Sequence, residues 1–371
     1  MNALRHNSPR DWSRRAIGVL EADFNRSSDT HLIPLPLPAF PGIHLYFKDE
    51  SSHPSGSLKH RLARSLFLYA LSNGWLSEGM TVVEASSGST AVSEAYFARL
   101  LGLRFVAVIP RGTSEEKVAR IRFYGGDVHW AESPAQLVEE SAALALRLGG
   151  HFMDQFTYAE RATDWRGNNN IAETIFLQMR REPHPEPAFI VCGAGTGGTS
   201  ATLGRYVRYR GHETRIVVAD PERSVTFDHF VTGDPSLRSG ESTRIEGIGR
   251  PRVEKSFLRS VVDGMVQVPD ACSLAALDYL ESALGRCVGG STGTLFHGAL
   301  PLIQRMAERG EQGSVVVLLC DGGERYTRTY YSSEWRRSQG LDASDELERI
   351  RSFLIEGRSQ RWPVRTAGWA A

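Results

Sequence analysis

A single lysine, Lys59, lies between a turn of small residues and a helix-patterned run. The turn is Ser55-Gly56-Ser57, an extended run over 44–50 precedes it, and the helical pattern covers 62–71. A lysine at the start of a helix lies near unpaired backbone N–H groups and the positive end of the helix dipole, which disfavour its positive charge. Such an amine can form a Schiff base with a carbonyl cofactor. A Ser-capped helix with an ordinary surface lysine is the alternative that this stretch alone leaves open.

A glycine-rich loop over 195–199, Gly-Thr-Gly-Gly-Thr, lies between an apolar strand-like run and a helix. Glycines let the backbone approach a ligand closely, while the N–H groups at the helix start and the threonine hydroxyls can bind a phosphate. No Walker lysine follows, which excludes an NTP-binding P-loop. A dinucleotide fingerprint also fits, because Gly193, Gly195 and Gly198 give GxGxxG and Asp220 ends the next strand. A tight structural turn is the third alternative.

Two more loops of small residues precede helix-patterned runs. The loop 86–90, Ser-Ser-Gly-Ser-Thr, offers hydroxyl and N–H groups that suit a carboxylate or a phosphate, or that simply cap the helix. The loop 289–294 places Ser291 in a glycine-rich bend, where its hydroxyl could hydrogen-bond a ring nitrogen or belong to a plain turn. The histidines show no metal-ligand spacing, so we expect no metal site and interpret His53 and His60 as solvated or packing residues.

Short apolar runs alternate with helix-patterned segments and would position these loops. Strand-like runs cover 81–85, 104–110 and 127–130, and the pattern starts again with 189–192, 215–219 and 315–319. This alternation predicts an α/β fold of two domains, each with an open, mainly parallel sheet flanked by helices. We place the domains at 1–150 and 151–336, with the segment 1–45 able to cross to the other domain. The cleft between two such domains is the default site.

The remaining C-terminal tail, 337–371, is charged. It carries one amphipathic patch, formed by Leu347, Ile350, Phe353 and Leu354, that could dock on the body of the protein or on a second subunit. The segment 222–250 is polar and glycine-rich, and we interpret it as a long connecting segment.

Composition limits the classes of partner. Lys+Arg and Asp+Glu both number 43 in the 371 residues, which argues against a broad nucleic-acid or anionic-membrane surface. No apolar run approaches membrane-span length, and the polar N-terminal residues show no signal-peptide pattern. The four cysteines, Cys192, Cys272, Cys287 and Cys320, form no CxxC pair, so a disulfide scaffold is not expected. We therefore expect a cytoplasmic protein that acts on a small molecule.

Taken together, the loops resemble those of the fold-type II pyridoxal-phosphate (PLP) enzymes of the cysteine synthase and cystathionine β-synthase family. The segments that carry the resemblance are Gly56-Ser57-Leu58-Lys59-His60-Arg61, Ser86-Ser87-Gly88-Ser89-Thr90, Gly195-Thr196-Gly197-Gly198-Thr199 and Gly289-Gly290-Ser291-Thr292-Gly293. They occur in the family's order within 28–336, and Gln155-Phe156, Glu246-Gly247-Ile248-Gly249 and 321–326 match as well. The segments 27–32 and 161–170, with the Ser-Ser-Gly-Ser-Thr form of the loop, are more similar to the L-cysteine desulfhydrase branch.

The resemblance implies a role for each loop. It implies that PLP is the cofactor and that Lys59 holds it through a Schiff base and then acts as the catalytic base. Cofactor-binding residues would be Lys59, Ser89, Gly195, Thr196, Gly197, Gly198, Thr199 and Ser291. The substrate carboxylate would be bound by Ser86, Ser87, Gly88, Thr90 and Gln155. Ser89 stands where the family usually has Asn, which normally contacts the ring hydroxyl of the cofactor, so this contact is expected to weaken or move.

The resemblance also implies a reaction. Ser291 would pair with the ring nitrogen, and a neutral hydroxyl does not keep that nitrogen protonated as a carboxylate would, which favours β-elimination and β-replacement over transamination. The activity implied is β-elimination of L-cysteine to hydrogen sulfide, pyruvate and ammonia by a homodimer. The first alternative is a cysteine synthase that makes L-cysteine from O-acetylserine and sulfide. The alternative from another class is a nicotinamide-dependent oxidoreductase that uses 193–198 and Asp220.

Overall fold

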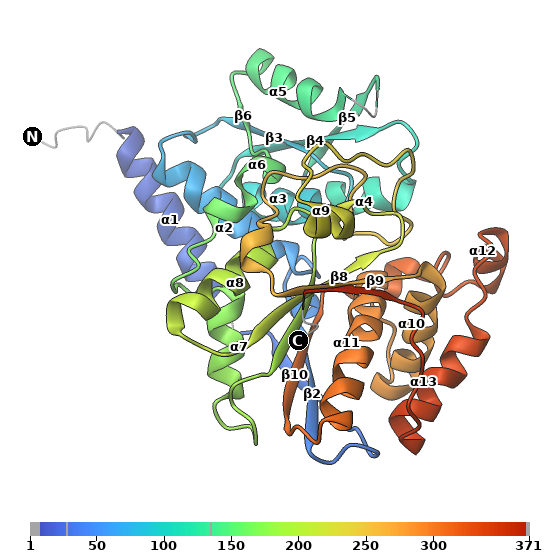
Figure 1. The fold of residues 1–371 in the computed structure, drawn as a ribbon. Coiled ribbons are helices and arrows are strands. Elements are labelled where there is room, and N and C mark those ends of the chain that lie inside the picture. Colours follow the sequence, from blue (N-terminus) through green and yellow to red (C-terminus); the bar gives the residue numbers. More distant parts are fainter. Residues whose placement is uncertain (1–7, 27–28, 134–135, 369–371) are drawn as a thin grey trace, which may run out of the picture. The chain divides into compact units, whose positions relative to one another are not determined.

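The computed structural model describes residues 8–26, 29–133 and 136–368. The chain divides into two compact units, one of Met1–Asp29 and His53–Thr163 and one of Thr30–Ser52 and Asp164–Ala371. Each unit has its own sheet of mainly parallel strands flanked by helices (Figure 1), so the predicted fold class is confirmed. Ser27 and Ser28, which contribute to the resemblance of the segment 27–32, lie outside the described residues.

The first unit is built on a parallel four-stranded sheet in the order β5-β4-β3-β6. Alternate residues of β4 belong to two separate cores: Phe105, Ala107 and Ile109 to one, and Val106 and Val108 to the other. Side chains alternate between the two faces of a strand, so both faces of this sheet are covered, with α5 on the face away from α2 and α3 (Figure 1). The elements are α1 (Pro9–Asn25), α2 (Lys59–Ser72), β3 (Thr81–Ala85), α3 (Ser89–Leu100), β4 (Arg104–Pro110), α4 (Glu115–Phe123), β5 (Asp127–Ala131), α5 (Leu137–Arg147), β6 (His151–Phe152) and α6 (Gln155–Ala162).

The second unit is built on a seven-stranded sheet in the order β1-β2-β10-β7-β8-β9-β11. The inner strands are parallel, and β1 and β11 close the two edges in antiparallel pairs. Its strands are β1 (His31–Leu35), β2 (Ile43–Asp49), β7 (Phe189–Gly193), β8 (Arg215–Pro221), β9 (Gly264–Val268), β10 (Gly313–Leu319) and β11 (Arg365–Ala367). Its α-helices are α7 (Ile171–Met179), α8 (Gly198–Arg210), α9 (Thr226–Thr232), α10 (Asp270–Leu284), α11 (Gly290–Glu308), α12 (Ser333–Ser338) and α13 (Ser344–Glu356).

The division between the units differs from the boundary predicted near residue 150. It falls after Thr163, because β6 pairs with β3 and because Tyr158 of α6 packs its ring against Tyr69 and Trp75 of the first unit. The segment 30–52 belongs to the second unit, because β2 pairs in parallel with β10. Pairing between strands that are distant in the chain therefore decides which unit each segment joins.

The prediction that residues 289–294 form a loop is wrong, because α11 begins at Gly290 and Ser291 lies in its first turn. Glycine is a poor helix former, which is why this stretch reads as a bend in the sequence. In the fold the glycines permit close packing of helices: a Cβ at Gly293 would lie 2.3 Å from the carbonyl oxygen of Ser273 on α10. The polar segment 222–250 likewise contains one helix, α9, that its composition does not indicate.

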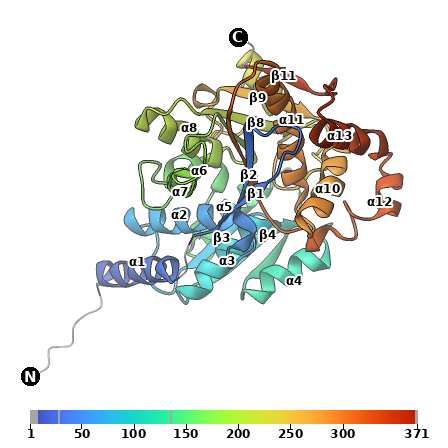
Figure 2. The same cartoon turned by 90° about the horizontal axis from the view of Figure 1, so that it is seen from below.

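The C-terminal tail docks on the second unit and is not a separate appendage. Helix α13 lies beside α10 (Figure 2) and buries Ile350, Phe353 and Leu354. Beyond it, Gln304 of α11 holds the chain: its Oε1 accepts the backbone N–H of Gln360 and the indole N–H of Trp362, both at 3.0 Å. Strand β11 then pairs with β9 and so covers an edge of the sheet. Of the two docking surfaces that the sequence allows, the described tail uses the body of its own chain.

We expect Phe353→Ala to lower the free energy of unfolding by about 3–5 kcal/mol, the usual range for removing a buried phenylalanine. Phe353 is 1% exposed, and its ring centroid lies 4.7 Å from that of Phe40 and 5.3 Å from that of Trp362. The matched control is Ile355→Ala on the same helix, which is 58% exposed and should change stability by less than about 0.5 kcal/mol. Urea unfolding followed by tryptophan fluorescence measures both, and equal effects would contradict the docked tail.

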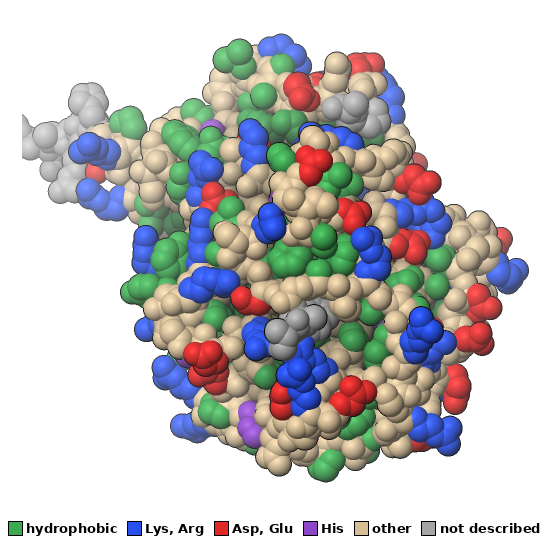
Figure 3. Space-filling model, viewed as in Figure 1, with side chains coloured by type: hydrophobic (Ala, Val, Ile, Leu, Met, Phe, Trp, Pro, Cys, Tyr) green, Lys and Arg blue, Asp and Glu red, His purple; other side chains and the backbone are tan. Residues whose placement is uncertain are grey.

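The surface of the described chain carries charges of both signs. Basic and acidic side chains are both scattered over the face seen in Figure 3. Among the helices that the structure describes, none combines the length and apolar character that a membrane crossing requires.

Candidate active site

Lys59 is the first residue of α2, so the predicted position of this lysine at a helix start is confirmed. Gly56 has φ of +76°, a conformation that glycine adopts without strain, and this turn directs the chain into the helix. The N-cap residue, Leu58, makes no side-chain cap, and Ser57 Oγ accepts the Lys59 N–H at 3.3 Å. The Lys59 side chain is half-buried. Lys59 therefore belongs to the first turn of a helix, where backbone N–H groups lack partners within the helix.

A buried hydrogen-bond network holds this turn against α3. Ser55 Oγ lies 3.0 Å from His60 Nδ1 and 2.8 Å from the hydroxyl of Ser93. The His60 ring stacks on His53, with centroids 4.8 Å apart, and packs against Phe97 at 4.6 Å. Of the two roles that the sequence allows for His60, the structure shows packing, and that packing fixes the residue that follows Lys59.

The loop 86–90 lies in the same unit and leads into α3, which begins at Ser89. Within the loop, Ser86 Oγ accepts the Gly88 N–H at 3.2 Å. Thr90 donates its hydroxyl hydrogen to Gln155 Oε1 at 2.8 Å, although the two residues are 65 positions apart. Two residues that the resemblance assigns to the substrate carboxylate are thus in contact. Sequence spacing alone does not indicate that contact.

The loop 195–199 lies in the second unit, between β7 and α8. Gly197 is the N-cap of α8 and has φ of +90°. A Cβ there would lie 2.5 Å from Phe257 Cα, and a Cβ at Gly195 would lie 2.5 Å from the carbonyl oxygen of Gly247. Neighbouring backbone therefore excludes side chains at both glycines. The loop presents a bare backbone cradle at the N-terminus of a helix, as phosphate binding requires.

Ser291 lies near this loop, within the second unit. A Cβ at Gly193, at the end of β7, would lie 3.2 Å from Leu295 of α11, whose first turn carries Ser291. Ser291 is buried, and the next residue, Thr292, accepts the Cys320 N–H at 3.2 Å through its hydroxyl oxygen. Because β7 and β10 are parallel neighbours, the loops after them and the start of α11 meet at one edge of the sheet.

Asp220 is unsuited to binding a ribose. Its carboxylate is completely buried, Oδ2 accepts the Phe227 N–H at 3.0 Å, and burial raises the pKa of Asp220 to about 7. An acid that hydrogen-bonds the ribose of a dinucleotide must reach solvent at the strand end. The environment of Asp220 therefore argues against the dinucleotide interpretation of Gly193, Gly195 and Gly198.

The fold also brings together a Cys, a His and a Glu that the sequence separates. One ligand atom from each of Cys272, His297 and Glu346 lies within 4.8 Å of the others, and all three residues are buried. His297 Nε2 lies 2.7 Å from Glu346 Oε1, and Arg349 donates to the other carboxylate oxygen. These contacts occupy both oxygens of Glu346 and connect α13 to α11, so a structural connection accounts for the cluster.

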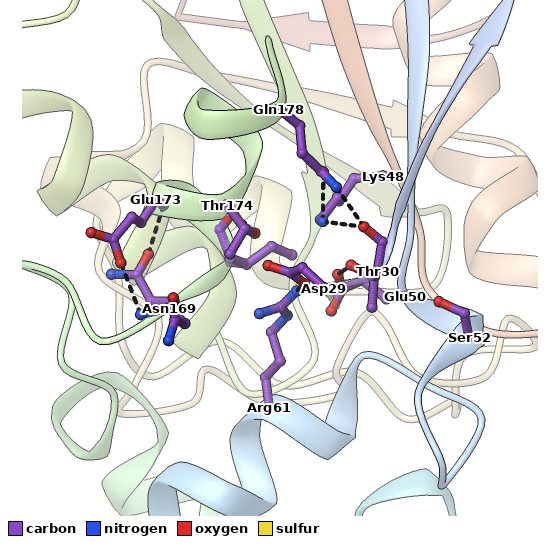
Figure 4. A network of polar contacts seen from close by, with 12 residues as sticks. Asp29, Thr30, Lys48, Glu50, Ser52, Arg61, Asn169, Glu173, Thr174 and Gln178 are labelled. Atoms are coloured by element: carbon purple, nitrogen blue, oxygen red, sulfur yellow. Dashed lines mark hydrogen bonds and ion pairs between the residues drawn. The ribbon is translucent and has the colours of Figure 1, made fainter. Parts of the chain in front are cut away.

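Lys48 is a second lysine of interest, which sequence reasoning did not single out. It is fully buried at the end of β2, and its Nζ donates to the Thr30 carbonyl at 2.9 Å and to Gln178 Oε1 at 2.8 Å (Figure 4). Thr30 donates its hydroxyl hydrogen to Glu50 at 2.7 Å. These hydrogen bonds give the Lys48 amine a structural role within the second unit. In the first unit, Arg61 of the lysine motif pairs with Asp29 at 2.6 Å.

Comparison with protein families finds one match over most of the chain. Residues 26–321 match the family model described as pyridoxal-phosphate dependent enzyme. The chain is similar to the L-cysteine desulfhydrase Cds1 of Mycobacterium tuberculosis, with 57% identity over 95% of this chain and 96% of that protein. It is also similar to a putative cysteine synthase of Sinorhizobium fredii, with 30% identity over 80% of this chain and 86% of that one.

A solved structure shows the same arrangement of elements. The crystal structure of an O-ureido-L-serine synthase matches with a TM-score of 0.69 and 29% sequence identity, over 81% of this chain and 91% of that chain.

Proposed function

Because this chain belongs to the pyridoxal-phosphate dependent enzyme family, we propose that it is an L-cysteine desulfhydrase. The reaction converts L-cysteine and water to hydrogen sulfide, pyruvate and ammonia. The observation that carries this proposal is the 57% identity, over 95% of the chain, to a protein named L-cysteine desulfhydrase. The segment 161–170 and the Ser-Ser-Gly-Ser-Thr loop support it, because both resemble the same branch.

The residues of this chain fit PLP. The bare backbone at Gly195 and Gly197 and the start of α8 suit its phosphate, and the buried hydroxyl of Ser291, near that loop, suits its ring nitrogen. Lys59 supplies the amine for the Schiff base, and Ser89 lies in the first turn of α3. When bound, PLP supplies an electron sink for the pair left on the substrate α-carbon.

The other residues would bind the substrate and move its proton. The Lys59 amine removes the α-proton of cysteine as a general base, a step that commonly contributes about 10²–10⁴-fold to the rate. Ser86, Ser87, Gly88, Thr90 and Gln155 bind the carboxylate, which orients the α-carbon toward that amine. Ser291 accepts or donates only as a neutral hydroxyl. Because a neutral hydroxyl does not keep the ring nitrogen of the cofactor protonated, expulsion of the sulfur substituent is favoured over transamination.

A cysteine synthase is the second candidate, favoured by the 30% identity to a putative cysteine synthase. The two activities use the same residues and differ in whether a nucleophile adds after elimination. The deciding experiment supplies L-cysteine alone and measures sulfide and pyruvate together. Equal amounts of both products support the desulfhydrase. Absence of cysteine turnover, with rapid cysteine formation from O-acetylserine and sulfide, would replace it with the synthase.

Thr90→Val should raise the KM for L-cysteine about tenfold and change kcat by less than about threefold. The substitution keeps the shape of the side chain and removes the hydroxyl that donates to Gln155 at 2.8 Å, a loss of about 1–2 kcal/mol in binding. Thr232→Val, at the exposed end of α9 in the second unit, makes the same chemical change and should alter neither constant. Steady-state sulfide release measures both variants, and an unchanged KM in Thr90→Val would remove Thr90 from the substrate site.

Compartment and assembly complete the proposal. The structure shows no disulfide among the four cysteines, all of which lie in the described residues. This supports a reducing compartment, and we propose the cytoplasm. A homodimer is implied by the family resemblance. Light scattering coupled to gel filtration would test the assembly, and a monomeric mass in the active fraction would rule it out.

A further inference from the structure

Two carboxyl groups are buried next to the loop proposed to bind the substrate carboxylate. Glu84 is the penultimate residue of β3, the strand that leads into the loop 86–90. Glu94 lies on α3, the helix that follows this loop. Both side chains have no exposed surface. Neither residue belongs to a motif that the sequence analysis singled out, and nothing in the reaction proposed above uses them.

Glu84 holds two segments that converge on the loop. Its Oε1 accepts the Ala85 N–H at 2.7 Å, at the point where β3 leads into Ser86. Its Oε2 accepts the Gln155 N–H at 3.2 Å, at the start of α6. Gln155 in turn accepts the hydroxyl hydrogen of Thr90. The Glu84 carboxyl group therefore connects the beginning of the loop 86–90 to Gln155. The side chain of Gln155 contacts Thr90 at the end of the same loop, and its backbone begins α6.

Glu94 is the partner of Glu84. Neither of its carboxyl oxygens receives a hydrogen bond from a donor in the described part of the chain, although both are buried. Glu84 faces the side of β3 that α3 covers, because Val82, two residues earlier, packs in one core with Ala95 of α3. Burial raises the pKa of Glu94 well above its usual range, and the neighbouring Glu84 raises this pKa further. Burial also raises the pKa of Glu84, to about 8, and the charge of Asp154 adds to that shift. Two buried carboxylates side by side are strongly unfavourable unless a proton lies between them.

We propose that Glu94 is protonated and donates to Glu84, and that Glu84 is thereby a positioning residue for the substrate-carboxylate site. The proton has two consequences. It gives one oxygen of Glu94 a hydrogen-bond partner, and it removes negative charge next to a loop that must attract an anion. The inference rests on the proposed function for the identity of the substrate, whereas the protonated pair rests on the burial of both carboxyl groups and on the missing donors at Glu94.

The first test reads the proton directly. Infrared spectra at pH 7, recorded for the wild type and for Glu94→Gln and subtracted from each other, should show a protonated carboxylic acid band that is present in the wild type and absent in Glu94→Gln. Glu346→Gln is the control, because it changes a buried carboxyl group of the second unit that is hydrogen-bonded to His297 and Arg349. It should leave that band in place. A spectrum that Glu94→Gln leaves unchanged would overturn the pair.

The second test separates positioning from general stability. Glu94→Gln retains an N–H donor for Glu84 and should keep the KM for L-cysteine within about twofold, whereas Glu94→Leu removes the donor and should raise it about tenfold. Glu84→Gln replaces one of the two acceptor oxygens and should raise the KM about tenfold, with kcat changed by less than about threefold and PLP content unchanged. An unchanged KM in both Glu94→Leu and Glu84→Gln would overturn the positioning role.

The two tests also separate this inference from the function on which it rests. If Glu84→Gln does not fold, the comparison of Glu94→Leu with Glu94→Gln decides the role of the pair, and equal KM values would overturn it. If the wild-type protein releases no sulfide from L-cysteine, the desulfhydrase proposal fails. The infrared band and the dissociation constant of L-alanine, a carboxylate ligand without a leaving group, then test the pair. A band and a weaker L-alanine complex in Glu84→Gln would support it.

Discussion

Lys59→Ala should abolish sulfide release from L-cysteine and remove the visible absorption band of the PLP-loaded protein. The expected loss of rate is at least about 10²–10⁴-fold, because the variant lacks the general base and the amine that forms the Schiff base. Lys59 is suited to both roles by its position: it opens α2, after a glycine turn with φ of +76°. Paired assays of sulfide and pyruvate, with a visible spectrum of each preparation, measure the effect.

Lys117→Ala is the matched control for this prediction. Lys117 is the other lysine of the first unit, and it is the third residue of α4, outside the motifs that carry the family resemblance. Its replacement should leave the absorption band and the rate within about twofold of the wild type. Retention of the band and of sulfide release in Lys59→Ala would assign the Schiff base to another lysine and contradict the site proposed here.

Gly197→Ala should lower the affinity for PLP by at least about tenfold and also lower the melting temperature. Two penalties combine at this residue. A residue with a Cβ is strained at φ of +90° by about 1–2 kcal/mol. The added Cβ would also lie 2.5 Å from Phe257 Cα and 2.6 Å from the carbonyl oxygen of Ser256, and displacing that backbone adds about 1–3 kcal/mol. Relief of the clash distorts the cradle that we propose for the phosphate.

Gly211→Ala separates the cradle from backbone strain in general. Gly211 is the C-cap of the same helix, α8, and has φ of +71°, but a Cβ there would meet no atom within 4 Å. This control should reduce stability by about 1 kcal/mol and leave the affinity for PLP unchanged. Equilibrium titration of the cofactor-free proteins with PLP, together with thermal unfolding, compares the two. An unaltered PLP affinity in Gly197→Ala would show that residues 195–199 do not hold the cofactor.

The sequence alone determined the features that depend on local periodicity and on backbone sterics. Short apolar runs between turn residues predict β3, β4, β5, β7, β8 and β10, and all but β5 are mostly buried. The small residues of 55–57 and 195–199 predict turns that lead into helices, and Lys59 and Gly198 are indeed the first residues of α2 and α8. The order of these loops along the chain also carries the family resemblance, which the match over residues 26–321 confirms.

Only the tertiary structure decided which distant groups meet and which are removed from water. Thr90 contacts Gln155, and Glu84 accepts the N–H of Gln155, because α3, β3 and α6 converge at one end of a sheet. Strand β11 and helix α13 join the second unit through partners far away in the sequence.

Asp220 shows the same limit, because a carboxylate at a strand end has the same sequence signature whether it is exposed or, as here, completely buried. Burial and long-range hydrogen bonds depend on how elements pack, and no local pattern of residue types contains that information. Lys59 could therefore be found from its neighbours in the chain, whereas the buried carboxyl groups of Glu84 and Glu94 beside the loop 86–90 could be found only in the folded protein.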